Sequence, residues 1–427
     1  MNPRLGRLLA LLLLGLGYSP ARGEPDYEGP PIRYSASSPT DAVARLKGQI
    51  EAGGVTPQRR RRLGWLPAVL KALEIPESSQ TLVFSKTSLQ RKRISPARPR
   101  ALYYNDSVYV GYVRHGDKLE LSAVDPELGA VFYTVDQTNR DRLVITRDRG
   151  QCLSCHATRR TSGVPGYLVR SVFPDATGEP LGSLGGATTS HRTPLADRFG
   201  GWYVTGLHGG IRHRGNAVAD PGRSPPLDRD AAANRRTLEG LVDTRAYPRP
   251  GSDIVALMVL EHQANAHNLI TKAAYQARTA VYYEQAMNKA FDRPEGFLGA
   301  SSRRRIEAAG EALLQCLFFC GEAELASPIV GSSSFTTDFA AAGPRDKRGR
   351  SLREFDLETL LFRYPCSFLI YSESIDALPE VMRDFLARRT TEILSGKDRS
   401  GDYGHLTPAD RRAVYQILRE TAPERLR

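Results

Sequence analysis

The chain has 427 residues, of which 41% are hydrophobic and 25% charged. It is long enough to bury a large core in two or three structural units, which excludes a small protein held together mainly by disulfides. Its formal net charge of +12 favours an acidic protein partner or another anionic surface. No nucleic-acid-binding motif accompanies this charge, so a nucleic-acid partner is not expected.

Residues 1–23 have the pattern of a secretory signal peptide. Arg4 and Arg7 precede an apolar run over residues 8–16, and small residues follow at 21–23. The apolar run is too short for a membrane span. No cysteine lies near the cleavage point, which excludes a bacterial lipoprotein anchor. No later stretch is long and apolar enough either. We expect a soluble protein exported to the periplasm, with an uncleaved membrane anchor as the alternative.

Residues 24–80 form an N-terminal extended and helical segment. The part up to Thr40 is rich in Pro, Ser and Gly and is expected to be extended. Apolar residues at helical spacing then predict a helix from Asp41 until Gly53 ends it. A second helix is expected over residues 66–73, before Pro76.

Residues 81–220 are predicted to form a β-rich domain. Five short stretches rich in β-branched and aromatic residues are separated by turn residues; they cover 81–85, 101–104, 108–113, 119–124 and 130–135. Their close spacing favours antiparallel hairpins. The predicted fold class is α+β: an antiparallel β meander leads into a short cysteine-containing motif, and a mostly helical C-terminal part follows.

That motif is Cys152-Leu153-Ser154-Cys155-His156, or C-x-x-C-H. The spacing is the attachment signature of a c-type haem. Cys152 and Cys155 would add to the two haem vinyl groups, and His156 would bind the iron as its proximal ligand. Because the motif occurs once, we expect one covalent haem c.

Other interpretations of the two cysteines remain open. Cys152 and Cys155 could join Cys316 and Cys320 in a zinc site of four thiolates. The strand expected at 143–146 would also suit a thioredoxin-like redox pair, although the residues around the motif lack that pattern. The third alternative is a disulfide between Cys152 and Cys155, which would not require the histidine at position 156.

The residues after the motif offer further contacts for a haem. Arg159 and Arg160 could neutralise its propionates, with simple surface exposure as the equal alternative. After a strand at 167–173, the Gly-rich passage over residues 174–215 shows few regular elements. A loop of this length usually binds or wraps something.

The rest of the chain is predicted to be a linker and a helical region. Residues 221–251 are polar and Pro-rich, as in a linker or surface excursion. Residues 252–427 should pack on the haem domain as helices, starting with a strong helix capped by Ser252-Asp253. The expected helices run from 254 through 283, and over 303–319, 352–362, 379–394 and 408–420.

The second axial ligand of the iron is left open by the sequence. His208 or His213, in the Gly-rich passage, is a possible distal ligand, and Met258 is the alternative. A thioether would raise the reduction potential, whereas a second imidazole would lower it. Further candidates are His191, His262 and His267. An open iron would indicate a peroxidase or oxidase.

Three cysteines remain outside the motif. Cys316 and Cys320 lie one helical turn apart in an apolar stretch, and Cys366 follows later. Buried thiols are the simplest expectation. A disulfide between Cys320 and Cys366 is possible after export.

The chain after about residue 80 resembles a group of large bacterial proteins that contain a cytochrome c domain. The similar segments are 119–126, 163–166, 170–175, His191-Arg192-Thr193-Pro194, 200–206, Glu261-His262-Gln263 and Tyr364-Pro365-Cys366-Ser367. The resemblance implies haem binding and export, and it carries a role over only to Cys152, Cys155 and His156. Strands rather than helices precede the motif, so the small all-helical cytochrome fold is not expected for the whole chain.

Two functions follow from these expectations. The first is an exported monohaem c-type cytochrome that transfers electrons to or from a redox partner protein. The second is a haem enzyme of the peroxidase or oxidase type, which needs an open iron face and a nearby acid–base residue. A zinc-stapled exported scaffold is the remaining alternative.

Overall fold

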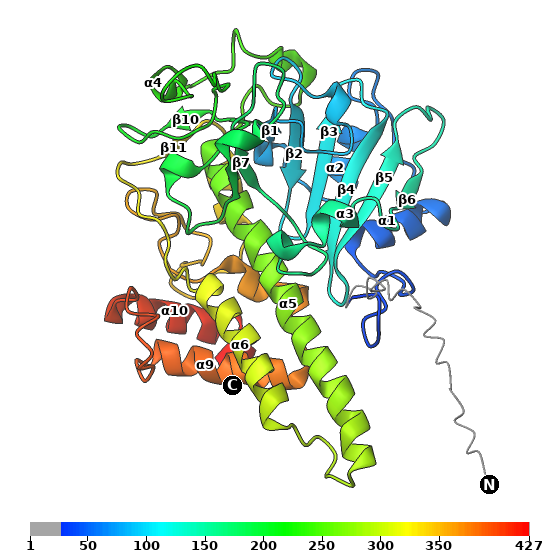
Figure 1. Cartoon of the computed structure of the whole chain (residues 1–427), viewed down its shortest axis with the longest axis vertical. Coiled ribbons are helices and arrows are strands. Elements are labelled where there is room, and N and C mark those ends of the chain that lie inside the picture. The colour runs from blue at the N-terminus through cyan, green and yellow to red at the C-terminus, as the bar shows by residue number, and fades with distance from the viewer. Residues whose placement is uncertain (1–26, 427) are drawn as a thin grey trace, which may run out of the picture.

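A computed structural model describes residues 27–426 (Figure 1). The predicted signal peptide, residues 1–23, lies outside this range. After two short N-terminal helices, the described chain forms a mostly antiparallel sheet region that is followed by further helices, which confirms the predicted α+β class. Within residues 27–426, no helix combines the length and apolar character needed to cross a membrane.

The main sheet has seven antiparallel strands in the order β6-β5-β4-β3-β2-β1-β9. These strands are β1 (Thr81–Val83), β2 (Arg100–Tyr104), β3 (Val108–Val113), β4 (Lys118–Asp125), β5 (Gly129–Asp136), β6 (Ile145–Arg147) and β9 (Trp202–Tyr203). Strands β1 to β6 pair in chain order, as expected of a meander built from hairpins. Two small two-stranded sheets pair β7 (Arg170–Val172) with β8 (Gly186–Thr188), and β10 (Gly206–Leu207) with β11 (Val330–Gly331).

Most helices follow the sheet in the chain. The helices are α1 (Ala42–Glu51), α2 (Leu66–Ala72), α3 (Leu153–His156), α4 (Arg229–Ala232), α5 (Ile254–Ala290), α6 (Ala300–Leu317), α7 (Phe335–Ala341), α8 (Glu373–Asp376), α9 (Glu380–Leu394) and α10 (Pro408–Thr421). In Figure 1 the long helix α5 runs from beside the sheet down to the group formed by α6, α9 and α10.

Strand β5 has a helix on each of its two faces. Tyr133 donates a hydrogen bond to Asp41, which caps the start of α1. The neighbouring Phe132 contacts the ring of His156, the last residue of α3. Because successive side chains of a strand point to opposite faces, α1 and α3 lie on opposite sides of the sheet.

Helix α5 joins the sheet to the C-terminal helices. Asp253 caps its start by accepting hydrogen bonds from the amides of Val255 and Ala256. Farther along, the Gln263 amide donates to the Tyr109 hydroxyl of β3 at 2.8 Å. The buried residues of sheet and helices form one continuous hydrophobic core, so the predicted β-rich and helical parts are packed together.

The helix expected over residues 352–362 is absent. Asp356 accepts hydrogen bonds from the amides of Glu358, Thr359 and Leu360, and this closes a tight turn. The turn brings Phe355 opposite Phe362 in a short antiparallel bridge. Local side-chain-to-backbone bonding thus replaces the helix that the apolar spacing predicted.

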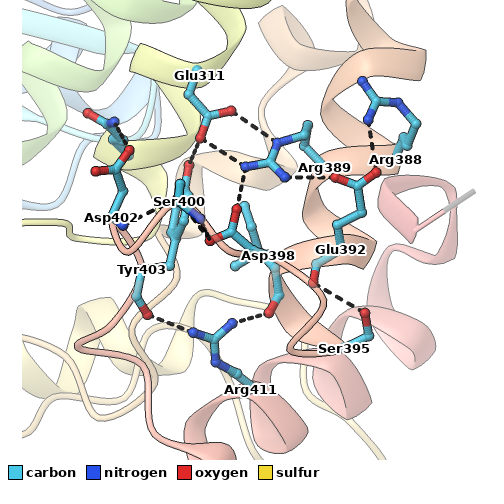
Figure 2. Close-up of polar contacts among 12 residues, drawn as sticks. Glu311, Arg388, Arg389, Glu392, Ser395, Asp398, Ser400, Asp402, Tyr403 and Arg411 are labelled. Carbon is cyan, nitrogen blue, oxygen red and sulfur yellow. Dashed lines mark hydrogen bonds and ion pairs between the residues drawn. The ribbon is translucent and has the colours of Figure 1, made fainter.

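A polar network ties the C-terminal helices together (Figure 2). Glu311 of α6 accepts hydrogen bonds from Arg389 of α9 at 3.1 and 3.2 Å, and from the Tyr403 hydroxyl at 2.7 Å. Arg389 also donates to Glu392 at 2.7 Å and to Asp398 at 2.8 Å. One guanidinium therefore serves three carboxylates from α6, α9 and the loop that follows α9.

The network lowers the pKa values of two of its carboxyl groups. The hydrogen bond from Arg389 is the main reason that the pKa of Glu392 lies below its usual range. Burial alone would raise the pKa of Asp398, but hydrogen bonds from Arg389 and Ser400 outweigh it and lower that pKa. Both groups therefore stabilise the fold in their charged form.

We predict that Arg389→Met lowers the free energy of unfolding by about 1–3 kcal/mol at pH 7, because charged carboxylates lose their donor. A carboxyl group whose pKa is lower in the folded than in the unfolded protein stabilises the fold at pH values above its unfolded-state pKa, which is about 4 for Asp and Glu. This stabilisation is lost as the pH falls through the folded-state pKa. The difference between variant and wild type should therefore shrink toward pH 3. Urea unfolding at several pH values measures it.

Arg388→Met is the matched control, because Arg388 lies beside Arg389 and pairs with Glu392 at a more exposed position. We expect it to change the unfolding free energy by less than about 1 kcal/mol. A loss in Arg389→Met that stays constant from pH 7 to pH 3 would contradict the role given to the network.

Candidate functional site

The three reactive side chains of the C-x-x-C-H motif lie on a single helical turn. The amides of Cys155 and His156 both donate to the carbonyl of Cys152, at 3.2 and 3.0 Å, which winds α3 into one turn. Residues three and four positions apart lie on the same face of a helix. The turn therefore presents Cys152, Cys155 and His156 on one side.

The imidazole of His156 is held in one orientation. Its Nδ1 lies 2.9 Å from the carbonyl oxygen of Gly166. Because a carbonyl only accepts, Nδ1 carries the proton and the lone pair is on Nε2. The ring of Phe132 packs against the imidazole with centroids 4.9 Å apart. Burial lowers the pKa of His156 and keeps the ring neutral.

Nε2 of His156 is available to a ligand. Among the described residues it has no hydrogen-bond partner, and it is not one of the fully buried polar atoms. A neutral imidazole whose other nitrogen donates to a carbonyl is the usual state of a metal-binding histidine.

The two thiols of the motif differ in environment. Cys155 is exposed, whereas Cys152 is half-buried and packs on the hydrophobic core. Burial, followed by the charge of Asp148, raises the pKa of Cys152 to about 12. Neither thiol is part of a disulfide.

Helix α5 fixes the loop that holds His156. The side chain of Asn268 accepts from the Tyr167 amide at 2.7 Å and donates to the Tyr167 carbonyl at 2.9 Å. Gly166 lies directly beneath this side chain: a Cβ there would be 2.2 Å from Oδ1 of Asn268. The absence of a side chain at Gly166 thus lets the loop approach α5 and direct its carbonyl toward His156.

Unpaired cations surround the motif. Arg159 and Arg160 are exposed, and within residues 27–426 neither forms an ion pair. Arg170 of β7 lies near Arg160 and Cys155, and burial followed by the charge of Arg160 lowers its pKa. This grouping would suit an anionic group bound beside Cys155.

The predicted distal ligands lie elsewhere in the fold. His208 uses both ring nitrogens, with Ile211 O at 2.9 Å and the Asn234 amide at 3.0 Å. His213 packs beside it with ring centroids 4.7 Å apart, and its Nδ1 accepts from the Gly215 amide. Burial lowers the pKa of His213 to about 3, so this ring is neutral.

Met258 is buried in the first turns of α5. Among the described residues, no hydrogen bond or ring contact joins His156 to His208 or His213, and His156 makes none with Met258. All three stay predictions for the distal position.

The remaining cysteines do not complete a zinc site with the motif. Within residues 27–426, Cys316 lies within ligand distance of His191 and His262, not of Cys152 and Cys155. Cys316, Cys320 and Cys366 are free and buried, which confirms the simplest expectation for them. The sequence suggested each of these residues separately, but it gave no signal that would group His191 and His262 with Cys316.

Two large cavities lie away from the motif. One of about 380 Å³ is lined by residues such as Leu314, Ile370 and Leu386 among the C-terminal helices. The other, of about 570 Å³, has five arginines among its fourteen lining residues, including Arg59 and Arg114. Neither cavity contains a residue of the motif.

Comparison with protein-family models, with curated proteins and with solved structures finds no match.

We predict that Gly166→Ala moves the loop away from Asn268 and breaks the hydrogen bond to His156. Overpacking of this kind costs about 1–3 kcal/mol in the free energy of unfolding. Urea unfolding measures the loss, and ¹⁵N chemical shifts of labelled histidine report whether the proton of His156 leaves Nδ1.

Gly182→Ala serves as the control, because a Cβ at Gly182 meets no atom within 4 Å. It should change stability by no more than about 0.5 kcal/mol. If Gly166→Ala matches this control in both measurements, the loop does not orient His156.

Proposed function

We propose that the protein is an exported monohaem c-type cytochrome that transfers electrons. The observation that carries this proposal is the single turn of α3, on which Cys152, Cys155 and His156 share one face and His156 keeps Nε2 free. This donor set fits a covalent haem, which needs two thiols and one neutral imidazole. When bound, the haem supplies a one-electron iron couple.

The residues around the turn would each serve this cofactor. Cys152 and Cys155 would hold the haem through thioether bonds, which do not require a thiolate in the finished protein. His156 would bind the iron through Nε2 while Gly166 keeps its ring in place. Residues 81–220, as the haem-binding domain, would supply the supporting sheet.

Charge supports the choice of partner. Arg159 and Arg160 have no acidic partner within the described chain, and the whole chain is basic. Such cations would neutralise haem propionates and attract an acidic redox protein to the same face. Export is proposed from the pattern of residues 1–23, and it agrees with haem attachment outside the cytoplasm.

We predict that Cys152→Ala/Cys155→Ala abolishes covalent haem. Wild-type protein from cells that mature c-type cytochromes should keep its red pigment on a denaturing gel, whereas the double variant should be colourless. Absorption of the gel band measures the difference. His156→Ala should retain the thioether bonds but shift the spectrum of the reduced protein, because the iron loses its proximal imidazole.

Cys366→Ala is the control for the loss of a cysteine, because Cys366 is buried and makes no disulfide. It should keep the pigment. Colourless wild-type protein from competent cells would refute the haem proposal.

An electron carrier should also resist external ligands. We predict that adding carbon monoxide to the reduced protein leaves its spectrum unchanged, because a second protein ligand occupies the iron. Mixing experiments monitored by absorption measure this. Rapid carbon monoxide binding by the wild-type protein would instead favour a peroxidase or oxidase.

A further inference from the structure

A second group of metal-binding side chains lies in the core, apart from the motif. His191 precedes the Gly-rich turn into β9, His262 lies in α5, and Cys316 lies in the last turn of α6. Their ligand atoms lie within 4.8 Å of one another. The three residues are only 1%, 0% and 1% exposed. Imidazole and thiolate groups are both ligands of transition metals.

The two imidazoles face each other through the same ring atom. Nδ1 of His262 lies 3.1 Å from Nδ1 of His191. Two nitrogens bound to one ion at about 2.0–2.1 Å lie about 3.3–3.6 Å apart. The pair therefore needs to open by only a few tenths of an ångström to accept an ion.

The two ring nitrogens of His191 differ, because Nδ1 faces His262 and Nε2 points away from it. This Nε2 is buried and has no hydrogen-bond partner. An ion held between the two Nδ1 atoms would place the proton of His191 on Nε2, so it would fix the tautomer of this ring without contacting Nε2.

Neighbouring side chains orient the other two ligands. The Ser367 hydroxyl lies 2.7 Å from Nε2 of His262, on the side of the ring opposite His191. The Asn265 side chain donates to Sγ of Cys316 at 3.3 Å. Hydrogen bonds to the outer atom of a ligating imidazole and to the sulfur are typical supports of a metal centre.

A buried ion pair holds the loop that bears His191 in place. Arg198 and Glu261 pair at 3.3 Å, with side chains 2% and 0% exposed. Arg198 also donates to the carbonyls of His191 at 2.8 Å and of Thr193. Glu261 directly precedes His262 in α5, so this pair connects the loop that bears His191 to the helix that bears His262.

We propose that His191, His262 and Cys316 bind one copper ion. Zinc in proteins is usually held by four ligands, or by three and a water that must be reached from solvent. Here the described chain supplies three ligands in a buried site, and two imidazoles with one thiolate form the trigonal set typical of copper. Binding displaces the thiol proton of Cys316. The proposal does not depend on haem.

The test uses the full-length protein, stripped of metal by a chelator and titrated separately with copper and zinc. We expect wild-type protein to retain one copper per chain after gel filtration. X-ray absorption at the copper edge, which iron does not obscure, should show one sulfur and two nitrogens. Cys316→Ser should lose the sulfur and the tightly bound copper.

Cys320→Ser is the matched control, because Cys320 is also buried and lies one turn farther along the chain. This variant should keep the sulfur ligand and the tightly bound copper. Circular dichroism checks that the variants fold. If Cys316→Ser does not fold, wild-type protein is alkylated in mild denaturant, where the buried thiol becomes reactive; added copper should then protect Cys316, as read by mass spectrometry. Copper retained without sulfur, zinc bound in preference to copper, or no metal retained by wild-type protein would each overturn the proposal.

Discussion

The paired hydrogen bonds between Asn268 and the backbone of Tyr167 are the contact on which the motif's geometry depends. They hold the 166–167 loop against α5, and the loop in turn orients His156 through the Gly166 carbonyl. A helical turn of four residues has little stability of its own. The direction of the His156 ring is therefore set by tertiary contacts rather than by α3.

Helix α5 can provide such contacts because its first half is buried on all sides. Burial makes each polar side chain there costly unless it has a partner. Asn268 meets this demand with both of its polar atoms, at Tyr167. Gln263 meets it in part through Tyr109 and Glu261 in part through Arg198, because Oε1 of each is buried without a partner among the described residues. His262 meets it on one side with Ser367 and on the other with His191. The same physical requirement thus produces both groups of functional candidates.

Local patterns allowed much of the fold to be predicted from the sequence. The meander from β1 to β5 and the long helix α5 follow from alternation, turn residues and a strong cap at Asp253. The C-x-x-C-H motif could also be found from the sequence, because its residues lie close together in the chain. The cluster of His191, His262 and Cys316 was not, since its members are 71 and 54 positions apart and meet only through tertiary packing. The missing helix at 352–362 shows the opposite failure, in which the side chain of Asp356 overrode a helical pattern.

The proposed haem centre and the proposed copper centre both depend on helix α5. His262 and Asn268 are six residues apart on α5, which is about 9 Å along a helix axis. Between the motif and this helix the core is filled by aromatic rings: Phe132 lies 6.4 Å from Tyr167, and Tyr167 lies 5.9 Å from His267. These rings are buried, and burial raises the pKa of Tyr167 and lowers that of His267, so both are uncharged. A buried, uncharged region of this kind would suit the electron transfer proposed for the haem, and helix α5 contacts both proposed centres.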